Sequence, residues 1–176
     1  MNSEQTKTLE ALKFAIQMEI DGKKYYEQAS QKCEVKVGKD LFEWLAAQED
    51  LHRKTFERIY KSIKNEKTWP EIDIKSVPGN TANTIFAQAN KTAVCKIETP
   101  RVELDTIDKA MDMENKTYDF YKKQGEAATY EAQAKFYRDL AAEERKHYLA
   151  LVDYREYIID PVGWFTKTEH HSLDGG

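Results

Sequence analysis

Two copies of a Glu-x-x-His motif lie 95 residues apart in this chain, and a lone glutamate precedes each copy by 30 residues. A shift of the sequence by 95 residues therefore superimposes the two sets without a gap. The spacing within each motif places its glutamate and histidine on one face of a helix. One such motif is ordinary on a solvated helix, but this repeat predicts a site for two metal ions. The six candidate ligands are Glu19, Glu49, His52, Glu114, Glu144 and His147.

The chemistry of these six side chains suits a pair of divalent cations. One glutamate from each of two helices, with a Glu-x-x-His from each of the other two, is the ligand set of di-iron and di-manganese carboxylate bundles. Four ionised carboxylates buried together repel one another, and two divalent cations neutralise them. Ligands without a thiolate favour Fe or Mn, with Zn as a possible substitute. Asp112 and Glu143 lie close to two candidates in sequence, and the repeat alignment selects Glu114 and Glu144.

The segments that carry the candidates have the periodicity of helices. Short turns, at residues 33–38 and around Gly125, make each pair of helices an antiparallel hairpin. Glu34 and Thr129 lie midway between the two glutamates of their halves, so every ligand glutamate is about 22 Å from a turn. The sequence therefore predicts an all-α fold, a four-helix bundle of two duplicated helical hairpins joined by a long crossover. The four helices are expected at residues 6–32, 39–65, 102–124 and 131–159.

The crossover spans residues 66–101 in this prediction. Prolines interrupt it, a short helix is expected at residues 83–90, and its apolar side chains indicate packing on the bundle. Residues 1–160 are assigned to one bundle domain, and Pro161 is expected to end the last helix. Residues 161–176 form a tail, whose Trp164 and Phe165 are expected to pack on the bundle or on a partner subunit.

The overall composition excludes several classes of protein. A length of 176 residues is enough for one domain with a core, and the net charge of −4 offers no basic surface for nucleic acid. No apolar run reaches membrane-spanning length and no secretory signal is recognisable, so we expect a cytoplasmic protein. Cys33 and Cys95 are expected to be free thiols in a reducing cytosol. Without a Cys-x-x-Cys motif, no rubredoxin-type or zinc-ribbon site can form within this chain.

Two tyrosines form a second repeated feature. Tyr26 and Tyr121 each follow a candidate ligand by seven residues, which is two helical turns. Their hydroxyls are expected to hydrogen-bond to ligand carboxylates across the bundle and to take part in catalysis. The competing interpretation is ordinary packing in the core.

The duplicated strings MEIDGKKYY and MENKTYDFY, with LAAQEDLH and LAAEERKH, resemble the rubrerythrin branch of the ferritin-like superfamily. The resemblance implies a non-haem di-iron centre with two Fe ions per chain, held by the six candidate ligands. Glu49 and Glu144 would be the bridging carboxylates, and Tyr26 matches a tyrosine near the iron pair. It also implies an oxidoreductase of oxidative stress that reacts with H₂O₂ or O₂, and a homodimer.

The chain departs from that family in two respects. It lacks the rubredoxin-like domain, so electrons are expected from a separate donor, such as a rubredoxin-like protein or a small reductant. Peroxidase rubrerythrins also carry a further glutamate one turn before the ligand of the third helix, where this chain has Met111. That difference puts efficient peroxide reduction in doubt.

Two other functions stay open at this point. The chain could bind or store iron without turnover, although the expected lack of a short fifth helix argues against a ferritin cage. Alternatively, the metal could only stabilise an interaction bundle. Glu169, His170 and His171 are either a polar terminus or a further metal site.

Overall fold

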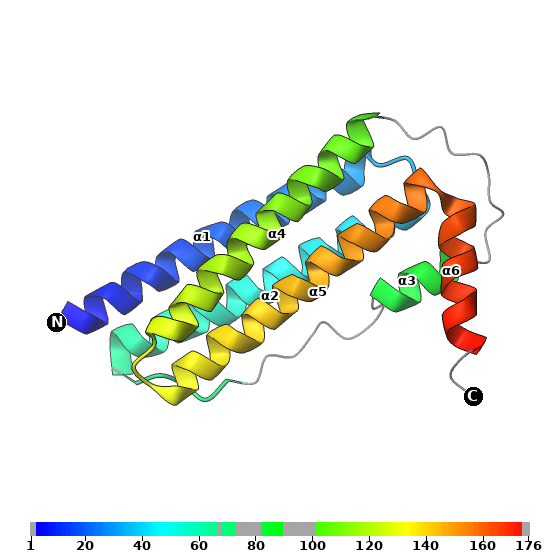
Figure 1. The fold of residues 1–176 in the computed structure, drawn as a ribbon. Coiled ribbons are helices and arrows are strands. Elements are labelled where there is room, and N and C mark those ends of the chain that lie inside the picture. Colours follow the sequence, from blue (N-terminus) through cyan, green and yellow to red (C-terminus); the bar gives the residue numbers. More distant parts are fainter. Residues whose placement is uncertain (1–2, 67, 73–81, 90–100, 174–176) are drawn as a thin grey trace.

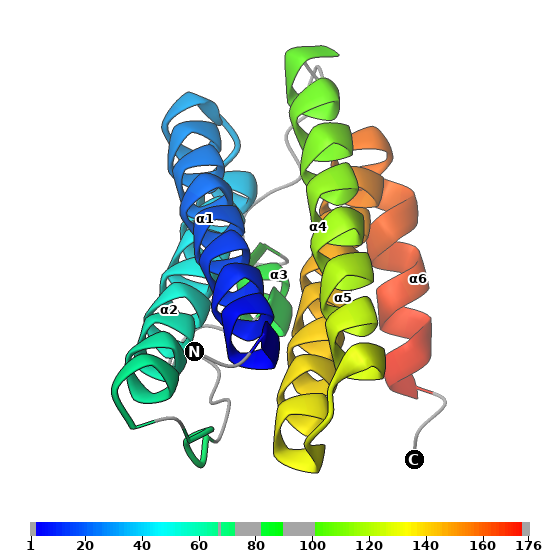
Figure 2. The ribbon, with the colours of Figure 1, turned by 90° about the vertical axis from the view of Figure 1, so that its left-hand side faces the viewer.

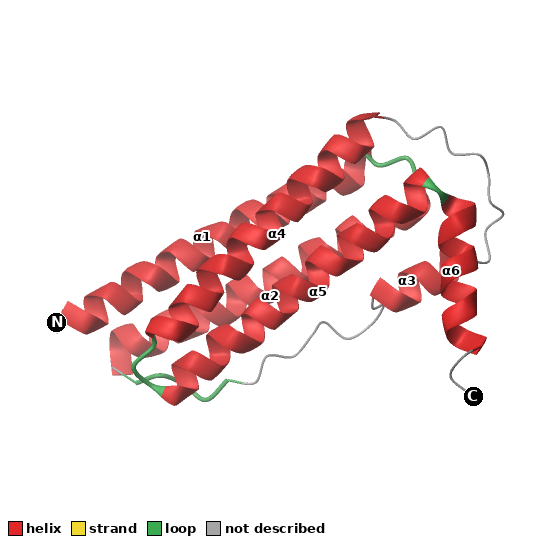
Figure 3. Cartoon of the chain, in the orientation of Figure 1, coloured by secondary structure: helices red, strands yellow, loops and turns green. Residues whose placement is uncertain are grey.

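The computed structural model describes residues 3–66, 68–72, 82–89 and 101–173, and all the regular structure in these ranges is helical (Figures 1 and 3). No helix among these residues is long and apolar enough to cross a membrane. Cys95, most of the predicted crossover and the side chains of Glu169, His170 and His171 lie outside the described residues. The helices are α1 (Ser3–Lys32), α2 (Lys36–Glu66), α3 (Ala82–Ala89), α4 (Arg101–Ala127), α5 (Glu131–Ile159) and α6 (Pro161–Leu173).

The four long helices form two hairpins, which confirms the predicted all-α bundle. Helix α1 packs mainly on α2, and α4 mainly on α5. Figure 2 shows the two pairs as separate halves that lie side by side. Each hairpin turns within three residues, 33–35 and 128–130, centred on Glu34 and Thr129. The candidate glutamates of all four helices are therefore at the same distance from their turns, as the spacing predicts.

The two turns are shorter than predicted, because neither Gly38 nor Gly125 belongs to one. Gly38 lies in the first turns of α2, and Gly125 lies near the end of α4. A Cβ atom at Gly38 would lie 1.9 Å from the hydroxyl oxygen of Tyr154, whereas one at Gly125 would meet only ordinary contacts from 3.5 Å. Gly38 is thus required by the close packing of α2 on α5, not by a change of chain direction.

A layer of polar side chains divides the core into two apolar clusters. Along every long helix, the candidate ligands separate members of one cluster from members of the other. The apolar faces of the four helices therefore bury the polar layer from both sides. The first cluster includes Tyr26, Phe42, Leu45, Ile107, Leu151 and Tyr154. The second includes Leu12, Phe56, Ile59, Tyr121, Tyr137 and Leu140.

A second polar cluster ties the turn of the first hairpin to the start of α4. The Tyr154 hydroxyl donates a hydrogen bond to Oε1 of the buried Glu103, and the Cys33 thiol donates to the same oxygen at 3.0 Å. Burial is the main cause that raises the pKa of Cys33 to about 12. Cys33 is therefore a protonated free thiol, as the sequence predicts.

Helix α6 corrects the expectation that the chain lacks a short fifth helix after its bundle. Pro161 does end α5, but it also begins α6, because the Oδ1 atom of Asp160 accepts a hydrogen bond from the Gly163 N–H at 3.0 Å and caps the new helix. Trp164 of α6 is buried between Tyr157 of α5, at 5.7 Å between ring centroids, and Phe86 of α3, at 5.4 Å. Helices α3 and α6 thus pack together beside the bundle (Figure 1).

The contrast between the two glycines gives a stability prediction. We expect Gly38→Ala to lower the free energy of unfolding by about 1–3 kcal/mol, because the added methyl group overlaps Tyr154 and Cys33. The matched change Gly125→Ala should be neutral or stabilising by up to about 1 kcal/mol, since alanine suits a helix better than glycine and its methyl group would make only ordinary contacts here. Urea unfolding of both variants measures the difference, and equal effects would contradict this account of Gly38.

Candidate metal centre

The structure brings all six predicted ligands into one buried layer. They come from the four long helices, and none is more than 4% exposed. By contrast, Asp112 is exposed and Glu143 is partly exposed beside Lys146. The alignment of the repeats therefore selected the inward-facing carboxylates correctly.

The two histidines face carboxylates from both hairpins. His52 Nδ1 lies 3.4 Å from Glu19 Oε2 and 3.2 Å from Glu144 Oε1. His147 Nδ1 lies 3.5 Å from Glu49 Oε1, 3.6 Å from Glu114 Oε2 and 3.5 Å from Glu144 Oε2. One oxygen of Glu144 therefore faces each histidine, as suits a carboxylate that bridges two ions.

The six residues divide into two overlapping groups whose donor atoms lie close enough to hold a cation. The first group contains Glu49, Glu114, Glu144 and His147, and the second contains Glu19, Glu49 and His52. Glu49 belongs to both groups. The arrangement thus offers two adjacent positions with Glu49 and Glu144 between them, which matches the bridging roles that the family resemblance implies.

Many of the donor atoms in this layer are buried without a hydrogen-bond partner. They include Oε2 of Glu19 and Glu114, Oε1 of Glu49, both carboxylate oxygens of Glu144, and Nδ1 of both histidines. Buried polar atoms left unpaired are costly, and buried charges are normally paired or bind metal. These unpaired donors converge on one another, so the residues present fit a pair of metal ions.

The charges of the cluster shift the pKa values of its members. Burial, together with the charges of Glu19 and Glu144, raises the pKa of Glu49 well above its usual value, and burial with Glu144 does the same to Glu114. Burial alone would lower the pKa of His52 and His147, but the surrounding carboxylates outweigh it and raise both values.

Glu144 shifts in the opposite direction. Burial alone would raise its pKa, but the two histidines outweigh that effect and lower it. The metal-free layer therefore retains protons on several of its other members. Because metal ligands must be deprotonated, metal binding has to displace those protons, and the affinity should fall as the pH falls.

The two repeated tyrosines connect the hairpins at this layer. The Tyr26 hydroxyl donates a hydrogen bond to Glu114 Oε1, and the Tyr121 hydroxyl donates one to Glu19 Oε1. In each case the tyrosine and the glutamate come from different hairpins, and the second oxygen of the glutamate stays unpaired toward the cluster. The predicted hydrogen bonds across the bundle are confirmed, while a catalytic role for either tyrosine remains a prediction.

Gly22 contacts a candidate ligand, which the sequence alone does not reveal. A Cβ atom at this residue would lie 3.0 Å from Glu49 Oε2. The backbone of α1 therefore approaches the Glu49 carboxylate closely, and glycine keeps space for it.

The sequence also did not identify Trp44 as a neighbour of the layer. Its ring meets the His147 ring edge-on, with 5.5 Å between centroids.

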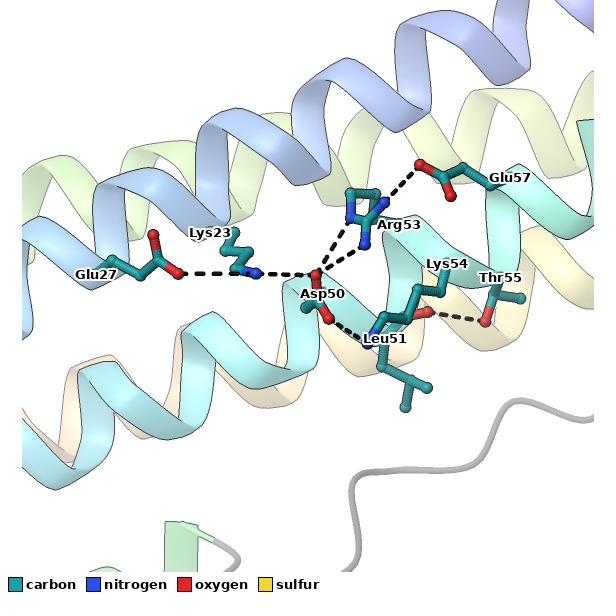
Figure 4. A network of polar contacts seen from close by, with 8 residues as sticks. All are labelled: Lys23, Glu27, Asp50, Leu51, Arg53, Lys54, Thr55 and Glu57. Atoms are coloured by element: carbon teal, nitrogen blue, oxygen red, sulfur yellow. Dashed lines mark hydrogen bonds and ion pairs between the residues drawn. The ribbon is translucent and has the colours of Figure 1, made fainter.

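An ion-pair network fixes α1 against α2 beside this contact (Figure 4). The Oδ1 atom of Asp50, next to Glu49 in sequence, accepts from Lys23 of α1 at 3.0 Å and from Arg53 at 3.1 Å. Lys54 is the leading cause that lowers the pKa of Asp50. The network holds the partly buried Asp50 ionised and links α1 to α2 at the residue next to Glu49.

Comparisons with known proteins agree with this architecture. The family model Rubrerythrin matches residues 10–153, a span that contains the whole six-residue layer. A solved structure of a hypothetical protein from Pyrococcus furiosus is similar, with a TM-score of 0.65 over 86% of this chain and 90% of that chain. At 23% sequence identity, that likeness shows the fold alone. No curated protein matches the chain.

Replacing Glu49 with glutamine separates the stability of the layer from its metal binding. The raised pKa of Glu49 means that metal-free stability is lost as the pH rises from the unfolded-state pKa through the folded-state pKa. We expect Glu49→Gln to raise the Tm of the metal-free protein at neutral pH and to weaken this pH dependence. The same variant should lose most of the increase in Tm that Fe²⁺ or Zn²⁺ gives the unsubstituted protein.

Thermal melts at several pH values, with and without metal, measure both effects. Glu43→Gln is the control, because Glu43 is exposed on the same helix and should change neither quantity. A Glu49→Gln protein that is less stable without metal, yet equally stabilised by metal, would contradict the assignment.

Proposed function

Because the chain belongs to the rubrerythrin family, we propose that its Glu–His layer holds two Fe ions and that the protein is an oxidoreductase. Its oxidant would be H₂O₂ or O₂. The observation that carries the proposal is the convergence of unpaired carboxylate and imidazole donors inside a bundle that buries them from both sides. A layer with only a packing role would not need these groups.

The donor set of carboxylates and imidazoles, without a thiolate, supports Fe or Mn over a structural zinc. Four carboxylates balance the charge of two divalent cations, and two neutral imidazoles add ligands without charge. Mn²⁺ and Zn²⁺ are possible substitutes at such a site. Iron, when bound, supplies the one-electron chemistry that glutamate and histidine side chains lack.

The protein's own residues would control protons and water around the metals. Tyr26 and Tyr121 hold their phenolic protons against Glu114 Oε1 and Glu19 Oε1, and burial raises the pKa of both phenols. Each tyrosine therefore orients one carboxylate and keeps the shared proton on its own phenol oxygen. The two apolar clusters exclude water above and below the layer, which strengthens these electrostatic contacts.

Turnover would require electrons from outside this chain. The sequence has no Cys-x-x-Cys motif for a rubredoxin-type iron site, so we assign the donor role to a separate rubredoxin-like protein or a small reductant. A homodimer, expected from the family resemblance, belongs to the same proposal.

The identity of residue 111 bears on the choice of oxidant. Met111 is partly buried and packs against the first apolar cluster, where peroxidase rubrerythrins would carry a glutamate. A thioether cannot act as a carboxylate ligand or accept a proton. We therefore expect peroxide reduction to show no large advantage over the reaction with O₂.

Iron storage is the second candidate, because helix α6 removes the argument that had set it aside. The chain does carry a short helix after the bundle, as cage-forming ferritins do. Storage predicts loading far above two Fe per chain in a large assembly, whereas the oxidoreductase predicts a fixed small number and repeated turnover.

The proposal predicts about two Fe per chain, as in known di-iron bundles. The Fe²⁺-loaded protein should be oxidised by O₂ or H₂O₂ much faster than free Fe²⁺ in the same buffer. Glu144→Ala should lose metal and this rapid oxidation together, because Glu144 faces both histidines. Elemental analysis and stopped-flow absorbance measure the two quantities.

Glu143→Ala is the matched control, since Glu143 is the preceding residue but pairs with Lys146 away from the layer. It should retain both the iron and the rapid oxidation. If Fe²⁺ binds without reacting with either oxidant, and Zn²⁺ stabilises the fold equally well, the structural interpretation of the metal replaces the redox one.

A further inference from the structure

A row of aromatic rings leads from the Glu–His layer to a partly exposed tryptophan. Tyr121, hydrogen-bonded to Glu19, lies 6.1 Å from Tyr137 between ring centroids, with an angle of 30° between the rings. Tyr137 in turn lies 6.1 Å from Trp69. Tyr121 and Tyr137 are fully buried, whereas Trp69 is partly exposed. The row therefore spans the distance between a ligand carboxylate and the surface.

The segment that carries Trp69 is held against the bundle. Ser62 Oγ of α2 donates to the carbonyl of Thr68, and Arg58 Nη2 donates to the carbonyl of Glu71, both at 3.1 Å. The indole also packs on Phe136 of α5, with 5.6 Å between centroids. Backbone contacts on both sides of Trp69 thus fix the ring where it meets Tyr137.

The three rings differ in what they can do with a proton. Tyr121 can pass its phenolic proton to Glu19 Oε1 when the ring loses an electron. The Tyr137 hydroxyl has no hydrogen-bond partner in the described part of the chain, and burial raises its pKa. The Tyr137 ring is therefore suited to let an electron cross, and the Tyr121 ring is suited to be oxidised. Indole and phenol are the most readily oxidised aromatic side chains.

We propose that Trp69, Tyr137 and Tyr121 form a path for single electrons between the protein surface and the Glu–His layer. Its use in turnover rests on the proposed function, because the H₂O₂ or O₂ reaction would supply the oxidising power. An oxidised Tyr121, whose proton has moved to Glu19 Oε1, takes one electron from Trp69 across Tyr137 and takes its proton back. Trp69 then takes one electron from the external donor, so one electron enters and no proton is gained or lost.

The other hairpin supplies an internal comparison. Tyr26 is the repeat equivalent of Tyr121 and bonds to Glu114 in the same way. The repeat equivalent of Tyr137, however, is Phe42, which stacks on Tyr26 at 6.2 Å and leads to the buried Tyr154. The contacts of Phe42 lead through Tyr154 and Tyr157 to Trp164, which is buried, and not to a partly exposed tryptophan. Tyr26→Phe is therefore a matched control for Tyr121→Phe.

The path can be tested without iron, in metal-free or Zn²⁺-loaded protein. A ruthenium polypyridyl photo-oxidant in solution removes one electron from exposed rings after a laser flash. Tyr121 is fully buried and cannot meet the oxidant directly. The flash drives the path in the direction opposite to turnover, because the oxidised Trp69 takes an electron from Tyr121 across Tyr137. We therefore expect a tryptophan radical to appear first and a tyrosyl radical to replace it. Transient absorption and electron paramagnetic resonance of frozen samples detect the two radicals.

Four substitutions give the expected pattern. Trp69→Phe and Tyr121→Phe should each abolish the tyrosyl signal, whereas Tyr26→Phe should retain it. Tyr137→Phe should also retain it, because the ring remains, and Tyr137→Leu should reduce it, because the ring is lost. A signal that survives Trp69→Phe, or that disappears with Tyr26→Phe instead of Tyr121→Phe, would overturn the proposal.

Tyr137→Leu opens space in the core, so its signal is compared only after circular dichroism and a thermal melt show a folded protein. Trp69→Phe does not depend on that check, because Trp69 is partly exposed. Trp164→Phe controls for the removal of a tryptophan and should retain the signal, since Trp164 packs on α3 and α5 away from Tyr137.

The iron-loaded protein then relates the path to turnover. Re-reduction by an external donor should slow in Trp69→Phe, with the iron content unchanged. If the flash experiment gives the expected pattern but Fe²⁺-loaded protein reacts with neither oxidant, the proposed function fails and the path stands. If oxidation is rapid but no tyrosyl radical forms through Trp69, the path fails and the proposed function stands.

Discussion

The burial of four carboxylates in one layer is the constraint on which the rest of this structure depends. Glutamates placed together away from water repel one another and lose their hydration, so each must have a cation, a proton or a hydrogen-bond donor. Two histidines and two tyrosines meet part of this demand, and several carboxylate oxygens remain unpaired. The apolar clusters on both sides keep the six side chains together despite their mutual repulsion. The same unpaired carboxylates that can bind metal therefore lower the stability of the metal-free fold.

Much of this arrangement is readable from the sequence, because it depends on spacing within helices. The 30-residue interval between glutamates, centred on Glu34 and Thr129, places the ligands at one height only if the chain turns at those residues, and it does. The i, i+3 spacing of Glu49 and His52 gives both the same inward face. Helical periodicity and a duplicated motif are local features of the sequence, so they can be recognised without knowledge of the tertiary structure.

The features that the sequence did not predict depend on contacts between distant residues. Gly38 resembles a turn residue until Tyr154, from the opposite hairpin, is seen to occupy the space of its missing side chain. Gly22 likewise acquires a role only through Glu49. Pro161 ends α5 and also begins α6, because Asp160 caps the N-terminus of α6. The partner of Trp69 could not be inferred either, because Tyr137 is far from it in sequence.

Each tyrosine of the layer bonds to a glutamate of the other hairpin, and this limits how such a chain can evolve from a single hairpin. A single hairpin contains one lone glutamate, one Glu-x-x-His motif and one tyrosine, but the acceptor of that tyrosine lies on the other hairpin. The smallest unit that completes these bonds is therefore a pair of hairpins. A half-length ancestor would have needed to associate with its own copy to assemble the site, and gene fusion would have made that association permanent. Only after the gene had been duplicated could equivalent positions, such as Phe42 and Tyr137, diverge independently.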